Sequence, residues 1–293
     1  REERTGDNVS IIISPVDQVW TEEVKGWAGI HLLHFQSSYC SQKVRVPLEE
    51  KGLFWQSHPI DRARDKHVSP WFLGINPRGV VPVLVLDGVV HVESNDIMEV
   101  LDGLPSEAEP FFPQSDVERE RVVAALARED ALHMDLRNLT MGFIMPHALA
   151  RKSPKTLLRW EREGREDPKR AREVAWWRDY ARDGISAETA QKSVDVHREV
   201  FDELDGLLAS STWLMGERLS VLDISWFITT LRLRNAGYPL ERHARLAAWH
   251  RELEKRPAFV AETREPWLLR TALAIYQAYR RITGSRLPDV TNP

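Results

Sequence analysis

The sequence predicts a protein of two domains, a small α/β domain followed by an all-helical domain. Within residues 30–104, apolar runs of strand length alternate with segments of helical periodicity. After residue 116 the apolar pattern has helical spacing throughout, and the stretch in between, LPSEAEPFFPQSD, contains three prolines and little periodicity. A chain of 293 residues is also long for one small domain. We therefore expect an N-terminal arm (1–29), an α/β domain (30–104), a linker (105–116) and a helical domain (117–293).

The α/β domain is predicted to hold a mixed sheet. Its elements follow in the order strand 30–35, helix 41–52, strand 53–60, short helix 69–75, hairpin 80–93 and helix 94–104. Two strands joined through a helix imply a right-handed parallel crossover, and Asp87-Gly88 is a strong hairpin signal that adds antiparallel strands. Gly52 is predicted to end the first helix, and Ser94 to cap the last one. Pro47 lies inside the first helix and is expected to kink it or to sit near its first turns. This order is that of a thioredoxin-like sheet.

The helical domain is predicted from long amphipathic segments. These are 117–145 (about eight turns), 185–211 and 213–234, the last with a capping-box start at Ser220 and Asp223. The charged segment 153–180 is predicted to be an insertion lying over the surface. Residues 266–282 are interrupted by Arg270 and Gln277 and favour an amphipathic helix, so we expect no membrane span. In the arm, VSIII (9–13) is predicted to add a strand.

Composition narrows the classes of function. Hydrophobic residues make up 42% and charged residues 29%, as in ordinary globular proteins, and the net charge of −4 offers no global field for nucleic acid or anionic membranes. A single cysteine, Cys40, excludes a disulfide framework and suggests a cytoplasmic protein. The ten histidines show no paired ligand spacing, so no metal is expected; His31 and His34 are predicted on opposite strand faces.

Three stretches carry a resemblance to one family. SSYCSQKVRVPLEEKGL (37–53) is similar to the SSCSxRVRxALxxKG pattern of zeta-class glutathione transferases. FLGINPRGVVPVLVLDGVVHVESNDI (72–97) resembles the glutathione-binding half of the cytosolic glutathione transferases, and GERLSVLDIS (216–225) resembles a buried helix of their second domain. The resemblance spans roughly residues 29–262 and is specific because three stretches match in order. It implies the glutathione transferase fold, glutathione as co-substrate and a homodimer.

The loop SSYCS contains the candidate catalytic residues. It precedes a helix N-terminus, where free N–H groups and the helix dipole stabilise an anion. A free thiol has a pKa of about 8.5, so a hydroxyl donating to sulfur there favours the reactive thiolate. Aligning Val44-Arg45 with the same pair in the zeta, tau and omega patterns places Ser38 on the family's catalytic position. Ser37 and Ser41 remain alternatives, and Cys40, two places later, is either a redox centre or a small buried hydrophobe.

The resemblance also implies the glutathione contacts. Pro82 corresponds to a family proline that follows a cis bond, and the backbone of Val81 would pair with the cysteinyl part of glutathione. Glu93 would hold the γ-glutamyl ammonium, and Ser94, at a helix start, its carboxylate. His67 corresponds to a residue contacting the glycine carboxylate, with Lys66 as the alternative.

The predicted reaction is attack of the glutathione thiolate on a hydrophobic, aromatic electrophile. Residues expected to line its pocket are Met141, Phe143, Met145, Trp176, Trp177, Tyr238 and Trp267. The pattern INPRG-VP-DG-ES is also similar to bacterial glutathione-dependent enzymes that cleave lignin-type β-aryl ethers. The alternatives are a glutathione-dependent thiol reductase using Cys40 and a non-enzymatic interaction protein that keeps only the fold.

Overall fold

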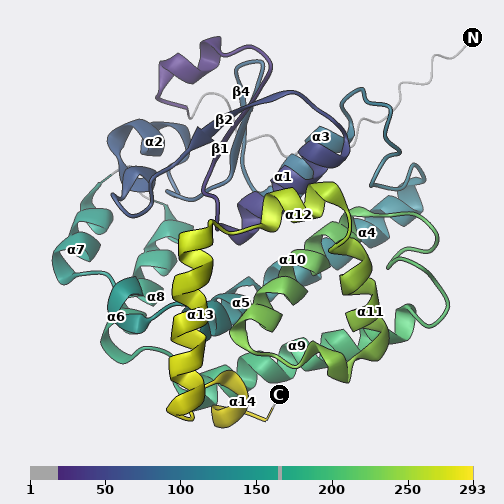
Figure 1. Ribbon diagram of the computed structural model, residues 1–293. Helices are drawn as coiled ribbons and strands as arrows, with labels where there is room; N and C mark the ends of the chain where they lie inside the picture. Colours follow the sequence, from purple (N-terminus) through teal and green to yellow (C-terminus); the bar gives the residue numbers. More distant parts are fainter. Residues whose placement is uncertain (1–18, 164–166, 293) are drawn as a thin grey trace, which may run out of the picture.

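A computed structural model of the chain describes residues 19–163 and 167–292, in which a small sheet domain packs on a larger helical domain (Figure 1). The strand order in the sheet is β2-β1-β3-β4; β1 is parallel to β2, and the other two pairings are antiparallel. This confirms the predicted thioredoxin-like sheet. The elements of this domain are the 3-10 helix η2 (Glu22–Gly26), β1 (Ile30–His34), α1 (Tyr39–Glu50), β2 (Trp55–Pro59), the 3-10 helix η3 (Lys66–Val68), α2 (Pro70–Ile75), β3 (Val83–Leu86), β4 (Val89–His91) and α3 (Ser94–Asp102).

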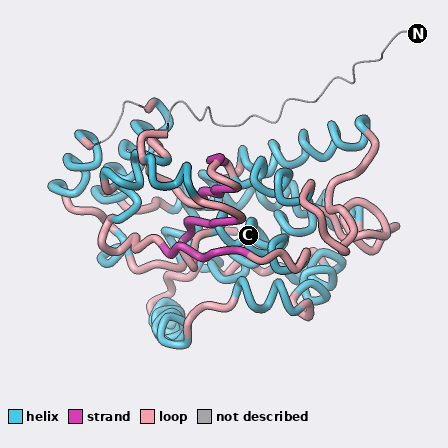
Figure 2. The backbone as a smooth tube through the Cα atoms, turned by 90° about the horizontal axis from the view of Figure 1, so that it is seen from above, coloured by secondary structure: helices cyan, strands magenta, loops and turns pink. Residues whose placement is uncertain are grey.

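The two faces of the sheet bury different partners because side chains alternate along a strand. Leu32 of β1 and Leu84 of β3 join the large core shared with α1, α3 and the helical domain. Leu33 and Val83 face the opposite side, in a smaller core with Val24 of η2 and residues of α2. Strands occupy only the centre of the molecule and helices surround them, as Figure 2 shows. The sheet is therefore the middle layer of its domain.

The hairpin turn forms where the sequence predicts it. Asp87 and Gly88 have φ angles of 48° and 80°, the left-handed pair that a two-residue hairpin requires. A side chain at Gly88 would put its Cβ 2.3 Å from the carbonyl oxygen of Lys25. Glycine is thus needed there both for the turn and for the close approach of the η2 segment.

Several predicted boundaries are wrong. The first helix begins at Tyr39, and Ser94 is the first residue of α3 while Glu93 holds the N-cap position. The predicted helix 117–145 is two helices that separate at Leu132, without a Gly or Pro to signal the break. The predicted strand 9–13 lies outside the described residues.

The helical domain surrounds a buried central helix, α10. Its elements are α4 (Asp116–Ala131), α5 (His133–Phe143), α6 (His147–Ala150), α7 (Pro154–Arg162), α8 (Pro168–Asp183), α9 (Ala187–Leu207), α10 (Val221–Ala236), the 3-10 helix η4 (Leu240–Arg242), α11 (Ala244–Leu253), α12 (Pro257–Thr263), α13 (Trp267–Ile282) and α14 (Leu287–Val290). The capping box is confirmed: Asp223 Oδ2 accepts from the backbone N–H of Ser220 at 2.9 Å and from its hydroxyl at 2.6 Å. Within the described residues, no helix has the length and apolarity to cross a membrane.

The segment predicted as an insertion, 153–180, forms most of α7 and α8. These helices do not lie loosely on the surface. Trp160 and Trp177 share a core with Val68 and Leu73 of the sheet domain, and Arg159 pairs with Asp65. In Figure 1 both helices lie below α2, on the side of the molecule away from α11.

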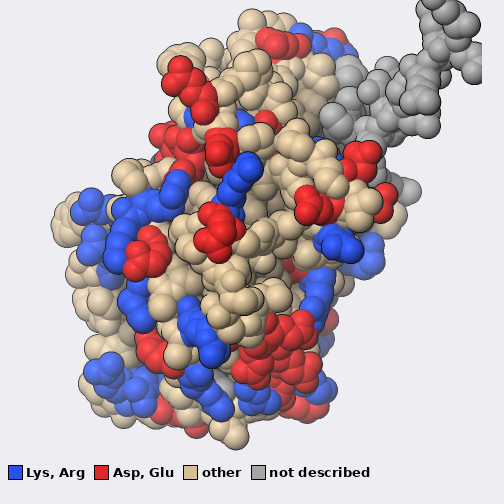
Figure 3. Space-filling model, turned by 90° about the vertical axis from the view of Figure 1, so that its right-hand side faces the viewer, with Lys and Arg blue, Asp and Glu red and all other residues tan. Residues whose placement is uncertain are grey.

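Charge is distributed without a dominant sign on the face drawn in Figure 3, where acidic and basic side chains are interspersed. This agrees with the nearly balanced totals of 40 basic and 44 acidic residues. Such a mixed surface supplies no strong long-range field, so recognition must come from local groups.

Helix α1 joins the two domains through a buried ion pair. Lys43 Nζ lies 2.6 Å from Glu129 Oε2 of α4, and both side chains are 1% exposed. Lys43 also donates to Asn95 Oδ1 at 2.9 Å, and Glu129 Oε1 accepts from the Thr229 hydroxyl at 2.8 Å. Burial lowers the pKa of Lys43 and raises that of Glu129. Each charge therefore depends on the other for its stability in this interior.

We expect Lys43→Met to destabilise the protein by about 3–5 kcal/mol, because it leaves Glu129 buried without a cation. Urea unfolding of this variant measures the loss. The double variant Lys43→Met/Glu129→Leu removes both charges and should recover most of the stability. A double variant no more stable than the single one would show that the pair itself supplies the stability.

Candidate active site

The loop between β1 and α1 places the hydroxyl of Ser38 at a helix N-terminus. Ser38 is the N-cap residue of α1, with extended backbone angles, and its Oγ accepts from the Ser41 backbone N–H at 3.3 Å. The side chain is partly exposed. Because that contact uses the oxygen only as an acceptor, the hydroxyl proton of Ser38 remains available to a ligand atom.

The two alternative serines are engaged elsewhere. The hydroxyl of Ser37 donates to Glu265 Oε2 at 2.5 Å, so its proton is already committed. Ser41 is fully buried within α1, and its Oγ accepts from the backbone N–H of Phe35 at 3.4 Å. Of the three serines, Ser38 is the one that is partly exposed and whose proton has no acceptor within residues 19–163 and 167–292.

Cys40 lies in surroundings that oppose ionisation. Burial raises the pKa of its thiol; the Asp130 carboxylate adds to that effect, while Lys43 and a hydrogen bond with Ser94 oppose it. The net direction is upward, so less thiolate is present at neutral pH than in a free cysteine. The thiol points toward Ser94 and thus toward the start of α3.

Positive charge converges on the same loop. Arg232 of α10 donates to the backbone oxygen of Ser37 and, at 3.0 Å, to Gln42 Oε1. The N-terminus of α1 adds its partial positive charge, and Lys43 lies one turn further along the helix. An anion held beside Ser38 would be stabilised by the helix end and Arg232; the Lys43 charge is paired with Glu129, and the Glu265 carboxylate at Ser37 opposes the other two.

Glu93 is the N-cap residue of α3. It has a φ of 66°, one of three such non-glycine residues among those described, and such a strained conformation is typical of ligand sites. Its Oε1 accepts from Arg78 Nη1 at 2.6 Å and from Lys169 Nζ of α8 at 3.3 Å. Neither cation was a predicted site residue; Lys169 reaches Glu93 from 76 residues away.

Val81 and His67 occupy different environments. The Val81–Pro82 bond is cis, as the resemblance implies. Val81 lies two residues before β3, so its peptide groups stand outside the sheet ladder.

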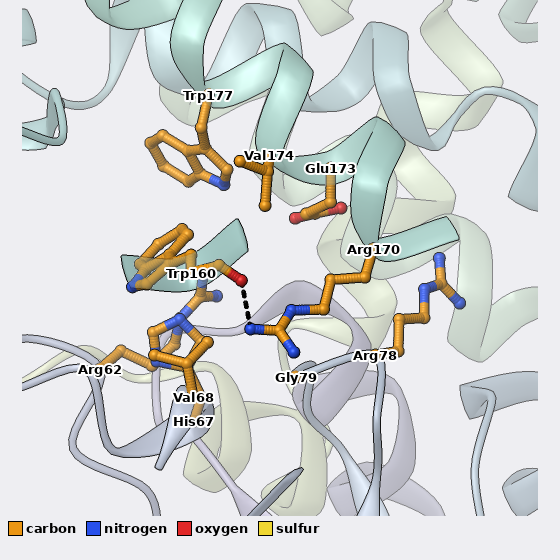
Figure 4. Close-up of a pocket in the computed structure, with 10 residues that line it drawn as sticks. All are labelled: Arg62, His67, Val68, Arg78, Gly79, Trp160, Arg170, Glu173, Val174 and Trp177. Carbon is orange, nitrogen blue, oxygen red and sulfur yellow. Dashed lines mark hydrogen bonds between the residues drawn. The ribbon is translucent and has the colours of Figure 1, made fainter. Parts of the chain in front are cut away.

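His67 is 3% exposed and its ring packs edge-on against Trp160 at 5.1 Å (Figure 4). Burial, with Arg62 and other cations nearby, lowers the His67 pKa to about 3, so the imidazole is neutral.

The structure does not gather the predicted pocket residues in one place. Tyr238 is 2% exposed inside the helical domain, with its hydroxyl 2.8 Å from His243 Nε2, and is a core residue rather than a pocket residue. Phe143 is also buried, under the Arg280 guanidinium at 4.6 Å. Trp267 is 71% exposed. The remaining predicted residues pack beside α8 in the core of Trp160 and Tyr180: Met141, Met145, Trp176 and Trp177.

Comparison with known proteins defines the class. Residues 37–104 match the model of the glutathione S-transferase N-terminal domain, and residues 188–252 match that of its C-terminal domain. The β-etherase LigF from Sphingobium sp. strain SYK-6 superposes with a TM-score of 0.69 at 25% identity, covering 80% of this chain and 98% of LigF. The architecture is therefore the glutathione S-transferase fold. Two regions of the chain, 37–104 and 188–252, are thus similar to the two domains of the glutathione S-transferase family.

Its sequence relatives are more distant or only partial. A tetrachloro-p-hydroquinone reductive dehalogenase of Sphingobium chlorophenolicum is 24% identical, over 78% of this chain and 94% of the relative. Glutathione S-transferase 1 of Dianthus caryophyllus is 36% identical over 85 residues, 29% of this chain. That alignment spans only 38% of the plant protein. These identities are too low or cover too little of the chain to assign a relative's substrate class to this protein.

We expect Cys40 to react slowly with iodoacetamide at pH 7, because its raised pKa leaves little thiolate. The alkylation rate should rise only at a pH above that at which a small free thiol responds. Cys40 is the single cysteine, so mass spectrometry reports on it unambiguously, and the urea-unfolded chain is the control. Equal rates for folded and unfolded protein at pH 7 would contradict the assignment.

Proposed function

We propose that the protein is a glutathione transferase that activates the glutathione thiolate with Ser38 for attack on a hydrophobic, aromatic electrophile. The observation that carries the proposal is the free proton of the Ser38 hydroxyl at the N-terminus of α1, next to Arg232. A hydroxyl donating to sulfur and a positive local field both lower the thiol pKa. Val81, Glu93, Ser94 and His67 are the proposed contacts to the rest of the tripeptide.

For the electrophile we propose thiolytic cleavage of a β-aryl ether. The likeness to LigF, which is a β-etherase, supports this class. The sulfur forms a bond to the carbon bearing the ether oxygen, the carbon–oxygen bond breaks, and the aryl oxide leaves with the electron pair and takes a proton. Turnover of an aryl ether with release of the phenol tests this reaction against halide and epoxide substrates.

We expect Ser38→Ala to lower turnover about ten- to a hundredfold at neutral pH, the effect of one hydrogen bond to an anion. Loss of the donor raises the thiol pKa of bound glutathione, so the rising limb of the pH–rate profile should move to higher pH. Glutathione affinity should persist. The controls are Ser37→Ala and Cys40→Ala, which should leave the profile in place.

If Cys40→Ala abolishes turnover while Ser38→Ala does not shift the profile, the thiol reductase is the correct function. A folded wild-type protein that binds glutathione but turns over no aryl ether, halide or disulfide would favour an interaction protein.

Glu93→Gln should weaken glutathione binding about ten- to a hundredfold, because the ammonium of the ligand loses a charged partner. Isothermal titration gives the Kd directly. Glu99→Gln is a matched control on the same helix; Glu99 pairs with Arg119 at 2.6 Å, away from the proposed contacts. An unchanged Kd for Glu93→Gln would remove this residue from the site.

A further inference from the structure

Helix α13 turns its apolar side outward. Its most buried residue is Arg280, which is 9% exposed and donates to the backbone oxygen of Gly142 at 2.7 Å. A surface helix ordinarily buries its apolar side and exposes its charges. Here five large apolar side chains are 59–85% exposed: Trp267, Leu268, Ile275, Tyr279 and Ile282. The orientation of α13 is therefore reversed.

The exposed apolar side chains form one strip along the helix. Leu268, Ile275 and Ile282 recur every seven residues, which is about two turns, so they lie in one row. Other exposed residues lie beside this row, and we call residues 267, 268, 271, 272, 275, 278, 279 and 282 the exposed strip. It contains no charged residue. Five large side chains with about 100 Å² of exposed surface each make a patch of the size that marks a protein or membrane interaction.

The position of α13 leaves the strip open to solvent. In Figure 1 the helix runs along the near side of the molecule, and in Figure 2 it is seen end-on at the edge. Its inner side is fixed, because Gln277 Nε2 donates to the backbone oxygen of Phe143 at 2.8 Å and Leu273 packs on the main core. The strip faces away from these contacts, so its whole length can meet a flat partner at once.

The charges beside the strip are positive. Arg270 and Arg281 are exposed and lie roughly three turns apart, so they stand on the same flank of the strip. Arg264 is exposed just before the helix. No ion pair joins any of these three arginines to an acid in the described part of the chain.

Acidic residues are missing from the helix itself. None occurs between Glu265 and Asp289. Glu265 accepts from the Ser37 hydroxyl at 2.5 Å, and Asp289 pairs with Arg286 at 2.8 Å. The arginines of α13 therefore lie beside an apolar strip without an anion of their own.

This combination fits a lipid surface better than a second copy of the chain. Two copies meeting strip to strip would bring arginines together, and neither α13 has an acid to pair with them. At an anionic bilayer, the apolar side chains enter the boundary between headgroups and acyl chains, while arginines on the flank reach the phosphates. Trp267 and Tyr279 are of the residue types enriched at that boundary. The net charge of −4 adds no long-range attraction, so the binding is local to α13.

We propose that the exposed strip of α13 docks the protein on an anionic phospholipid surface, with the helix lying flat in the boundary between headgroups and acyl chains. This inference goes beyond the proposed function. The docking is peripheral, since no helix within residues 19–163 and 167–292 can cross a membrane. The strip begins at Trp267, two residues after Glu265, so the lipid lies close to the loop that carries Ser37.

Flotation of the full-length chain with vesicles tests the docking. Vesicles of phosphatidylcholine and phosphatidylglycerol should bind the protein at least about tenfold more tightly than phosphatidylcholine alone, because arginines near the surface are attracted to anionic lipid. Added salt should reduce the difference by screening. Arg270→Gln/Arg281→Gln should remove most of the preference for anionic vesicles.

Ile275→Ser/Ile282→Ser tests the apolar part of the strip without changing the charge. Loss of two inserted side chains should weaken binding to the anionic vesicles about a hundredfold. Leu158→Ser/Leu207→Ser is the matched control: it removes two leucines of α7 and α9 that are 50% and 52% exposed, and it should bind like wild type. Circular dichroism confirms the fold of each variant.

Wild type that does not float with the anionic vesicles overturns the proposal, and so does equal binding by the two serine double variants. Light scattering without vesicles distinguishes the other occupant. A dimer of wild type that Ile275→Ser/Ile282→Ser converts to a monomer would assign the strip to a second copy of the chain and overturn the lipid docking.

Discussion

The geometry of the candidate site depends on how helix α1 is held. Lys43 and Glu129 form a buried ion pair between α1 and α4, and Arg45 pairs with Glu262 of α12. Two charges buried in the same helix are stable only while their partners stay in place. Any shift of α1 relative to the helical domain would expose or separate them. The N-terminus of α1, which carries Ser38, is therefore positioned by contacts deep in the domain interface.

This constraint also separates the roles of Ser38 and Cys40, which lie two residues apart. Ser38 is at the N-cap, outside the packed helix, where it is partly exposed and its proton is free. Cys40 is in the first turn; the residue is also partly exposed, but burial raises the pKa of its thiol. A difference of two positions thus changes the dominant effect from the helix dipole to burial. The Cys40 thiol is therefore a poor nucleophile. The Ser38 hydroxyl, at the helix N-terminus, is well placed to donate to the thiolate of a ligand.

Features encoded within a few residues were predictable from sequence, and features formed across the chain were not. The Asp87-Gly88 turn and the Ser220–Asp223 capping box are local, since a single tetrapeptide contains the required groups. The contacts of Glu93 with Lys169 and of Lys43 with Glu129 join residues 76 and 86 positions apart, which no pattern indicates. Tyr238 was misplaced because an apolar residue just after a helix does not reveal whether it lines a pocket or the core; here it is buried between α10 and η4.

The two cations on Glu93 influence what the site can bind. An incoming ammonium meets a carboxylate whose Oε1 already accepts from Arg78 and Lys169, so it must bind Oε2 or share the carboxylate with these two cations. Three cations on one carboxylate leave an excess of positive charge, which a nearby anion would offset. A simple amine supplies none, whereas the amino-acid end of a γ-glutamyl group brings a carboxylate together with its ammonium. This balance of charges favours a zwitterionic ligand at the proposed Glu93 contact, and Lys169 makes α8 a participant in that choice.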